Sequence, residues 1–374
     1  MVFWFQLQVG GKPAPPALRE ALQSVEVEEN ADGPDAMVLE LPVNRTASGD
    51  LKFIDDGTFE PYTQVSAILT AGGATQCIFD GYVLSWRLHL DRVAASSTIR
   101  VWAQDASWLM NVNDTVREWP GQTDGQVANS IFGNYGFSPA DANTDDDSPA
   151  HQPSQHTLFQ RATDLQFLHA LAQRNGKICR VACADKPGER TGYFIRPSLD
   201  GQPAATIALA SQATWAVDTL DLDWDVMRPT EVDASQVSLT DPSSSGVPGD
   251  ATSSGLSALG ARDLPTYAGR SSTLVLTATA DVPELPQRTT AVLRDAEWFG
   301  RCRGEADLDR LDTVLRAATV VAVTGAGSAH SGNWFVWRVN HLIAVDSCRI
   351  RFTLVRNAIG PPGQSGGGAA GSGQ

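Results

Sequence analysis

Short runs of alternating apolar and polar residues fill the first hundred positions of the chain. Glycine pairs such as Gly10-Gly11 and Gly72-Gly73 separate them, and glycine reaches the positive φ of a tight turn without steric cost. This spacing predicts the strands of an antiparallel barrel or sandwich. The predicted strands are residues 2–9, 24–29, 37–41, 64–71, 76–90 and 98–103.

The period changes to that of helices between about residues 106 and 176. Two segments, 123–126 and 163–166, share the pattern Thr-Asp-x-Gln. In such a capping box the threonine oxygen accepts from the third helical amide, and the glutamine reaches back to the amide of the cap. Apolar residues then follow at helical spacing until Gly136 and Gly176, which act as stop signals. Two amphipathic helices are therefore predicted.

The remaining chain returns to extended character, with a hairpin over 177–183 and 192–196, a strand over 232–239 and a helix-compatible segment over 288–301. Serine, proline and glycine between 241 and 260 bury too little apolar surface to offset chain entropy. The expected division is a first β-barrel (1–105), a helical or α+β insertion (106–200), a second β-barrel (201–240 and 261–357) with a mobile loop (241–260), and a flexible glycine-rich tail (358–374).

Two distant strand pairs match without a gap, residues 80–105 over residues 331–356. The matched positions are Gly81 with Gly332, Trp86 with Trp337, Arg87 with Arg338, Leu88 with Val339, Ile99 with Ile350, Arg100 with Arg351, and Val101 with Phe352. Glycine, tryptophan and alternation recur in any β-rich protein, but matches at fixed offsets favour a true duplication. The predicted fold class is mainly β with α insertions: two similar antiparallel β-barrels with a small α/β region between them.

Composition excludes several classes of partner. The chain has 374 residues with a formal net charge of −15, 42% hydrophobic and 19% charged, which is typical of an ordered protein whose average surface repels nucleic acid and anionic lipid. No apolar run reaches the length of a membrane-spanning helix, and no basic region precedes the apolar start. We therefore expect a leaderless protein made in the cytoplasm, with neither a nucleic acid partner nor a membrane span.

The cysteines and the acidic loop are the candidate metal ligands. Five scattered cysteines, Cys77, Cys179, Cys183, Cys302 and Cys348, favour free buried thiols over disulfides. Cys179 and Cys183 face one side of a strand, but a zinc site needs two further ligands. His151 and His156 near 145–147 could hold a divalent ion; a solvated acidic loop is the preferred interpretation.

Catalytic motifs are missing from the sequence. It contains no Gly-x-Ser-x-Gly elbow, no phosphate-binding glycine loop and no His-Glu-x-x-His. His341, between Asn340 and Leu342, is interpreted as a hydrogen-bonded barrel residue rather than a base, and His169 as a packed helix residue. We expect neither catalysis nor a cofactor.

Three stretches carry motifs that occur together in one known family: 79–83 with 102–105, 160–176, and 325–357. They resemble the phage late control D family, the baseplate hubs of contractile tails, in a form similar to VgrG without its fused spike. The motif positions are Gly81, Trp86, Asp105, Thr163, Asp164, Phe167, Leu168, Gly176, Gly327, Gly332, Arg338, His341, Arg356 and Asn357.

The resemblance implies a structural hub. Its three copies would present six similar faces, so that a homotrimer adapts a hexameric inner tube protein to a trimeric spike within a phage tail or injection-system particle. Other baseplate subunits are implied as partners, and because the chain ends in a glycine-rich stretch, the spike is expected to be a separate polypeptide.

Two rival functions remain at this point. A tail-associated, peptidoglycan-cleaving hydrolase would need a pair of converging carboxylates, and no pair stands out in the sequence. A β-rich carbohydrate-binding module could use the ten tryptophans as stacking platforms. Trp86, Trp102, Trp298 and Trp337 lie in patterned segments, which favours core positions for them.

Overall fold

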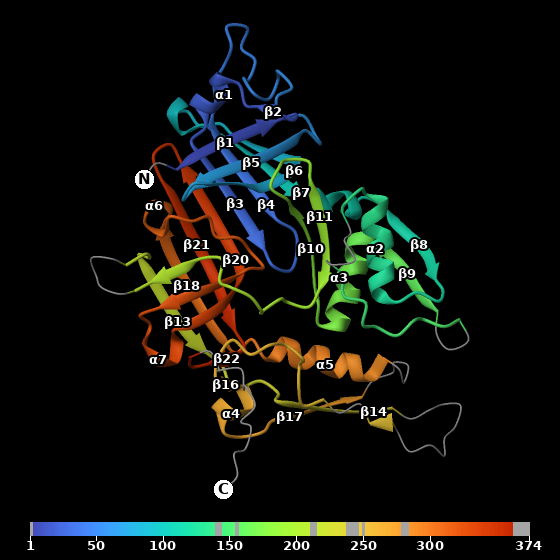
Figure 1. Ribbon diagram of the computed structural model, residues 1–374. Coiled ribbons are helices and arrows are strands. Elements are labelled where there is room, and N and C mark those ends of the chain that lie inside the picture. Colours follow the sequence, from blue (N-terminus) through green and yellow to red (C-terminus); the bar gives the residue numbers. More distant parts are fainter. Residues whose placement is uncertain are drawn as a thin grey trace.

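A mainly β fold with two similar antiparallel β-barrels and a small α/β region is present in the computed structural model, which describes residues 3–138, 144–153, 157–209, 215–236, 247–248, 251–277 and 284–361. Figure 1 shows the strands of the large sheet on the left, helices α2 and α3 with β8 and β9 on the right, and α5 with β14 and β17 below them.

The first barrel unit consists of seven strands and a short helix. They are β1 (Trp4–Val9), β2 (Lys12–Pro13), α1 (Pro16–Ala21), β3 (Ser24–Asn30), β4 (Ala36–Pro42), β5 (Gln64–Ala71), β6 (Ala74–His89) and β7 (Thr98–Asp105). Every second residue of β3 and β4 is buried, because successive side chains of a strand point to opposite faces. The strands predicted for this part of the sequence are confirmed, with ends that differ by a few residues.

The second barrel unit is assembled from segments that are separated in the sequence. Its elements are β12 (Thr206–Ala208), β13 (Thr219–Trp224), β18 (Gly300–Asp307), α6 (Leu308–Leu311), β19 (Val320–Thr324), α7 (Gly327–His330), β20 (Gly332–Ala344) and β21 (Cys348–Arg356). Alternation in β21 again buries one face, with Ile350, Phe352 and Leu354 in the core.

The two units have the same strand order. The order is β1-β5-β6-β7-β4-β3 in the first and β12-β19-β20-β21-β18-β13 in the second. Their outermost strands differ in direction, since β1 runs antiparallel to β5 whereas β12 runs parallel to β19. Strand β3 also pairs with the second half of β20, so the hydrogen-bonded ladder runs from one unit into the other.

A β-bulge marks the same place in both hairpins. It falls between Val83 and Ser85 in β6 and between Val336 and Arg338 in β20, opposite β7 and β21. When the bulges are aligned, β7 and β21 keep the register of the sequence match, but β6 and β20 are displaced from it by two residues. The ungapped match over β6 was therefore wrong, although the repeat that it indicated has the same topology.

Gly81 and Gly332 are consequently not equivalent, and each has its own steric reason. A Cβ on Gly81 would lie 2.0 Å from the backbone oxygen of Gln104 in the neighbouring strand. Gly332 has a φ of +127°, and a Cβ there would lie 2.7 Å from the guanidinium of Arg356. The coincidence of the two glycines follows from local crowding rather than from the repeat.

The α/β region has a separate core. Its elements are the 3-10 helix η2 (Ala106–Asn111), β8 (Asp114–Trp119), α2 (Asp124–Asn134), β9 (Leu158–Thr163), α3 (Asp164–Asn175), β10 (Ile178–Cys183) and β11 (Arg190–Ile195). The capping box of α2 is complete, whereas in α3 only the Thr163 oxygen accepts from the helix, so the second box is half formed. Both helices bury one apolar face, as predicted, but the hairpin β8–β9 was missed.

A further segment packs beneath the second barrel and α3. It contains β14 (Glu231–Gln236), β15 (Val247–Pro248), β16 (Arg262–Asp263), α4 (Leu264–Ala268), β17 (Thr273–Thr277) and α5 (Leu285–Ala296), with β22 (Ala358–Ile359) paired to β16. Of the expected mobile loop, residues 241–246 and 249–250 lie outside the described residues, and Ser254 and Leu259 are buried. Since Ala358 and Ile359 are also buried, the expected tail begins later than predicted, and 362–374 lie outside the described residues.

The crowding at Gly81 gives a stability prediction. Gly81→Ala should lower the free energy of unfolding by about 1–3 kcal/mol, because its methyl group must push apart the β6 and β7 backbones. Gly133→Ala is the matched control, since Gly133 lies in α2 with open space around its Cβ; alanine there should raise stability by up to about 1 kcal/mol. Thermal unfolding followed by circular dichroism would measure both, and equal melting temperatures would contradict the steric argument.

Candidate assembly site

The joint between the two barrel units is the pairing of β3 with β20. Its register places Glu28 opposite Asn340 and Val27 opposite His341. On the exposed face, Asn340 Nδ2 donates to Glu26 Oε1 at 2.6 Å. Apolar and polar contacts thus alternate across the joint, as expected for cross-strand neighbours in a half-buried sheet.

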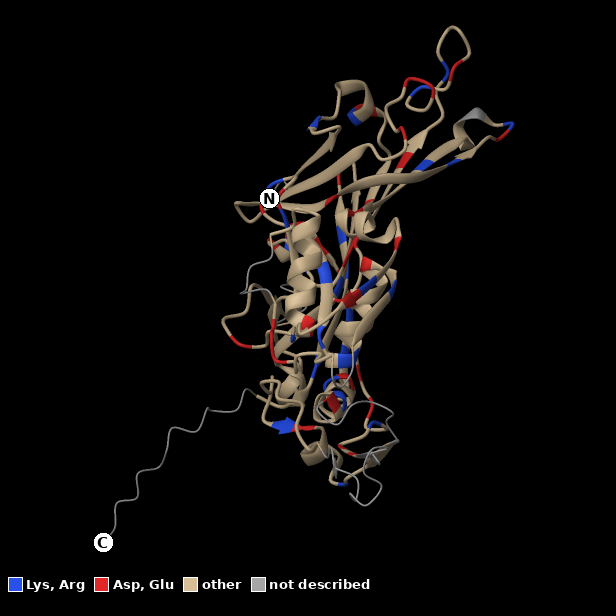
Figure 2. Cartoon of the chain, turned by 90° about the vertical axis from the view of Figure 1, so that its right-hand side faces the viewer, with Lys and Arg blue, Asp and Glu red and all other residues tan. Residues whose placement is uncertain are grey.

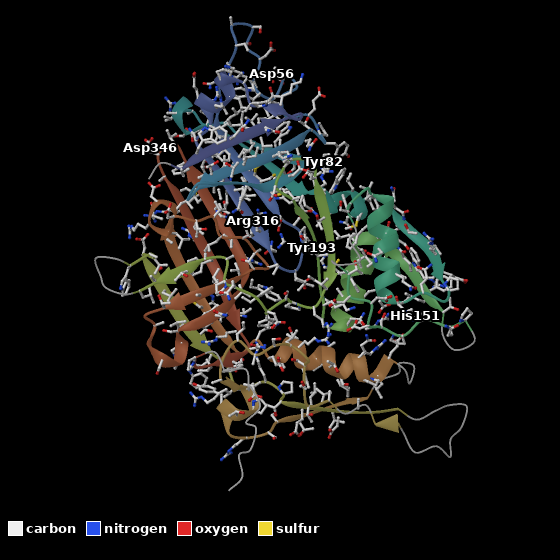
Figure 3. The ribbon with its side chains drawn as sticks, viewed as in Figure 1. Asp56, Tyr82, His151, Tyr193, Arg316 and Asp346 are labelled. Atoms are coloured by element: carbon white, nitrogen blue, oxygen red, sulfur yellow. The ribbon has the colours of Figure 1, made fainter. Side chains whose placement is uncertain are left out.

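A buried ionic cluster lies directly behind this joint. Arg316 Nε donates to both oxygens of Glu29, at 2.8 and 3.0 Å, and Arg316 Nη1 donates to Gln76 at 3.2 Å. His341 Nε2 lies 3.4 Å from Glu29 Oε1, and the side chains of Glu29 and His341 are both fully buried. Figure 3 places Arg316 where the sheet meets the α/β region.

Opposite charges keep Glu29 ionised. Burial alone would raise the pKa of Glu29, but the charge of Arg316 and the proximity of His341 outweigh it and lower the pKa to about 2. His341 is therefore a buried barrel residue beside a carboxylate, but neither of its ring nitrogens makes a hydrogen bond within the described residues, so the hydrogen-bonded part of the interpretation was wrong.

Two further carboxyl groups extend this cluster to the α/β region. Arg180 of β10 lies 3.6 Å from Asp35 Oδ2 and donates to the Ala317 oxygen at 3.1 Å. Asp105 accepts from the amides of Asp35 and Ser107, at 2.5 and 2.8 Å, so it fixes the end of β7. Burial raises the pKa of Asp105 to about 6 and that of Asp35 well above its ordinary value. The cluster joins both barrel units and the α/β region.

Arg356 and Asn357 anchor the end of β21. The Arg356 side chain is fully buried and donates to the carbonyl oxygens of Leu259, at 2.7 Å, and Ser331, at 3.3 Å. Burial without a facing carboxylate lowers the pKa of Arg356 to about 10. Asn357 accepts from the Leu259 amide at 2.9 Å and donates to the Ser257 oxygen at 3.0 Å. These two motif residues therefore hold the segment before β16 against the second barrel.

A second ionic cluster closes the α/β region against α5. His151 Nε2 lies 2.8 Å from Asp124 Oδ1, and His151 Nδ1 lies 3.3 Å from Glu284 Oε1. Arg174 donates to both oxygens of Asp124 at 2.8 and 2.9 Å. Burial alone would lower the pKa of His151, but hydrogen bonds to the two carboxylates raise it to about 9. His151 is thus a cation at neutral pH that bridges α2 and α5.

The acidic loop 145–147 is held by basic residues. Asp145 accepts from the Arg196 amide at 2.6 Å, and Asp147 lies 2.6 Å from Lys177 Nζ. Within the described part of the chain, no group of three or more His, Cys, Asp or Glu side chains could hold a metal ion. All five cysteines are free, and His156 lies outside the described residues.

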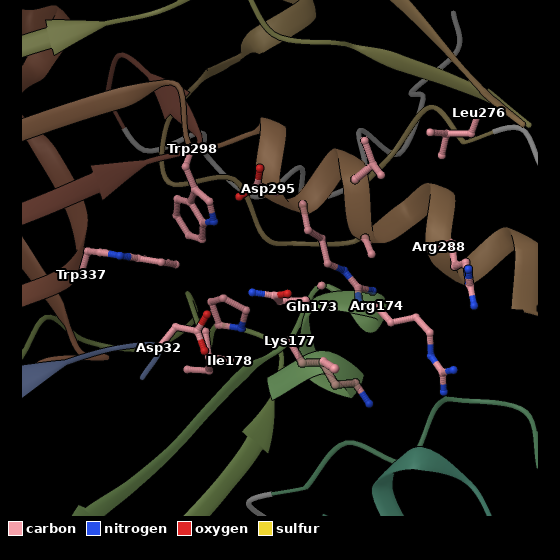
Figure 4. A pocket seen from close by; sticks show the side chains of 16 residues that line it. Asp32, Gln173, Arg174, Lys177, Ile178, Leu276, Arg288, Asp295, Trp298 and Trp337 are labelled. Atoms are coloured by element: carbon pink, nitrogen blue, oxygen red, sulfur yellow. The ribbon is translucent and has the colours of Figure 1, made fainter. Parts of the chain in front are cut away.

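A groove of about 870 Å³ lies between α3, α5 and β20. Figure 4 shows Trp298 and Trp337 at one end of it and the cationic side chains of Arg174 and Arg288 at the other. Residues of the α/β region, of α5 and of the second barrel line the groove. It therefore runs along the outside of the contact between the α/β region and α5, the contact that contains His151. Elsewhere, Figure 2 shows basic and acidic residues interspersed along the strands rather than separated by sign.

The structure spreads the remaining motif positions over several places. Asp164 accepts from Tyr135 at 2.8 Å and from Gln160 at 2.6 Å. Gly176 ends α3 in the left-handed conformation with a φ of +60°, as predicted. Phe167 and Leu168 are buried in the α/β core, Arg338 is exposed on β20, and Gly327 begins α7 with open space around it. The motif positions therefore lie at separate sites, some in packed cores and some at the surface, and do not form one pocket.

The expectation for the tryptophans was half wrong. Trp298 is buried and Trp337 is half-buried, but Trp86 and Trp102 are 45% and 37% exposed. Trp86 lies on the core-facing side of β6, opposite Val101, yet beyond the bulge no strand in the described residues covers that side. An apolar ring thus remains exposed at an open sheet edge.

Solved structures with this fold are tail proteins of phages and a secretion system. The 43 kDa tail protein of prophage MuSo2 from Shewanella oneidensis has a TM-score of 0.64 at 15% identity, over 96% of this chain and 99% of that chain. A tail protein from Neisseria meningitidis MC58 has a TM-score of 0.63 at 12% identity, over 96% and 97%. The E. coli c3393 protein, a type VI secretion component similar to bacteriophage T4 tail proteins, has a TM-score of 0.55 at 13% identity, over 94% of this chain and 76% of that chain. The chain has the fold of this class.

The chain matches the family model of the Alg8 N-terminal domain over residues 2–345 and belongs to that family. This match does not confirm the late control D family, which stays a prediction. No curated protein matches the chain. Among the described helices, none is long and apolar enough to cross a membrane.

The Glu29 cluster gives the second stability prediction. Glu29→Gln should lower the free energy of unfolding by about 3 kcal/mol, because Arg316 then lies buried without an anionic partner. Glu305→Gln is the matched control; Glu305 binds Arg349 and Arg351 at the surface, and its loss should change stability by less than about 1 kcal/mol. Chemical denaturation would measure both, and a small effect for Glu29→Gln would contradict the role of the cluster.

The His151 bridge predicts a pH dependence. Its pKa is raised from 6.5 to about 9 in the folded protein, so its stabilisation is complete below pH 6.5 and is lost as the pH rises through 9. The melting temperature of His151→Gln should therefore lie below that of the wild type at pH 6 and approach it near pH 10. His169→Gln is the control, because His169 is partly exposed and lies 4.0 Å from Asp32. A constant difference between wild type and His151→Gln across this range would refute the bridge.

Proposed function

We propose that the chain is the structural hub of a contractile injection system or phage tail, in which a trimer adapts the hexameric inner tube to the trimeric spike. The observation that carries the proposal is the repeat of one strand order in two units of the same chain. Three copies then offer six similar units, so a threefold body can contact a sixfold one. The fold of phage tail proteins over nearly the whole chain supports the same assignment.

The internal organisation also suits a subunit that transmits mechanical force. Buried ionic contacts connect the two barrel units to the α/β region through Glu29, Arg316 and Arg180, and connect α5 to that region through His151. Breaking a buried pair leaves an uncompensated charge in a poorly hydrated site, which costs several kcal/mol. Such contacts resist relative movement of the units while thrust passes from tube to spike.

The finer parts of the proposal follow from the sequence. They are the domain division at about residues 105, 200 and 357, membership of a late control D type of hub, additional baseplate partners, and assembly into a phage tail or injection-system particle. We propose no catalysis and no cofactor. Asp35 and Asp105 do approach each other with raised pKa values, as an acid–base pair would, but they are only 5% and 3% exposed.

Native mass spectrometry of the purified full-length chain over a range of concentrations tests the hub. The expected result is a species with three times the mass of the chain, alone or after addition of the tube and spike proteins of the same particle. A protein that stays monomeric under all these conditions would overturn the proposal.

A further inference from the structure

Two sheet edges remain open where the repeat predicts a neighbour. Within the described residues, β13 pairs on one side only, with β18. The side of β6 that faces β5 is paired only as far as Val83, and residues 85–90 beyond the bulge continue without a partner there. An open edge presents a row of backbone donors and acceptors that another strand can satisfy.

Each of these two open edges has an equivalent in the other unit, and the two equivalents, β3 and the end of β20, pair with each other inside the chain. Strand β13 occupies in its unit the position that β3 occupies in the first, and the end of β6 corresponds to the end of β20. The pairing of β3 with β20 therefore has a missing counterpart, in which β13 would pair with β6. Within the described residues of one chain, β13 and β6 stand at separate places in the strand order and do not pair with each other, so a second copy would supply the partner strand.

We propose that β13 of one copy pairs antiparallel with residues 85–90 of β6 in the next copy, by the same register that joins β3 to β20. This inference rests on the proposed function and specifies the contact between the subunits. The register carried over from the internal joint places Asp223 opposite Arg87, Asp221 opposite His89, Leu222 opposite Leu88, Leu220 opposite Leu90, and Trp224 opposite Trp86.

The side chains fit this register without adjustment. Acidic residues of β13 meet basic residues of β6 on the exposed face, and opposite charges directly across a strand pair are favourable. Leucines meet leucines on the core-facing side, where Leu88, Leu220 and Leu222 already contact the hydrophobic core. A displacement by one residue would put leucines against charges, so the match selects one pairing.

The contact also accounts for the apolar residues that are exposed at these edges. Trp86, Leu90 and Trp224 are 45%, 53% and 51% exposed. Their counterparts in the internal joint, Val339, Ile343 and Glu29, are buried with 0%, 3% and 0% exposure. Pairing with a second copy would cover the first set as the internal joint covers the second.

The geometry of the contact favours a closed ring. Each copy offers β13 at one place and β6 at another, so the association is head-to-tail, and such contacts close into rings when the rotation per step divides a full turn. The internal joint already sets the rotation from the first unit to the second. The same joint between copies would repeat this rotation, and three chains would close into a ring if each joint turns the next unit by one sixth of a full turn.

Disulfide capture tests the register. In Arg87→Cys with Asp223→Cys, the two sulfurs belong to directly opposed residues of neighbouring copies, whose Cα atoms are about 5 Å apart in an antiparallel pair, within disulfide range. In the control, Arg87→Cys with Thr219→Cys, the cysteines lie four residues apart along the strand, about 13 Å. The single-cysteine variants and the wild type serve as further controls, because they measure any crosslinking that involves the five native cysteines. The full-length proteins are oxidised and then resolved by mass without reductant.

The expected product of the matched pair is a closed covalent trimer, at least tenfold more abundant than in the control. Equal yields from both pairs in a protein that is trimeric by native mass spectrometry would overturn the strand pairing and leave the hub intact. Crosslinked dimers and longer open chains without a closed trimer would support the strand contact and count against the threefold hub.

A charge exchange provides a second readout that does not depend on oxidation. Arg87→Glu or Asp223→Arg alone should shift the trimer toward monomer at low salt, and the two together should restore it. Trimer levels unaffected by either single change would contradict the contact. Both positions are exposed strand residues, so neither change is expected to unfold the chain.

Discussion

The architecture depends on ionised Glu29, whose side chain is fully buried. Its carboxylate lies on β3, the strand that connects the two barrel units, and it is held by Arg316 and His341 from the second unit. Neighbouring Arg180 adds the α/β region to the same group. A buried charge that loses its partner is costly, so the two barrel units and the α/β region are held in fixed positions relative to one another. The sheet runs through both barrel units at the same place, where β3 pairs with β20.

Local structure in this chain could be predicted well from the sequence. The strand at 64–71 was predicted with its observed ends, and the helix stop at Gly176 has the expected left-handed conformation. Alternation and capping are properties of neighbouring residues, so a single sequence contains them. The antiparallel pair β8–β9 was missed because its strands are separated in the sequence by the α2 helix and because β8 carries little alternation.

The ionic clusters could not be predicted. Glu29 and Arg316 are separated by 287 residues, and His151 meets partners at positions 124 and 284. Nothing local indicates such pairs, and for His151 the sequence analysis considered only a solvated acidic loop, which it preferred, and a divalent metal ion. The tryptophans failed for a related reason: Trp86 has the pattern of a core residue and faces the core side, but whether it is covered depends on which strand lies beside β6.

The two units differ in the direction of their outermost strand, since β1 is antiparallel to β5 whereas β12 is parallel to β19. A ring of three chains would then be sixfold along its shared strands and only threefold along its rim. One surface of the proposed ring could bind a sixfold partner at six similar sites. At the rim the two kinds of outermost strand alternate, so a threefold partner could bind at three of the six positions. The change of symmetry would thus be built into the direction of a single strand.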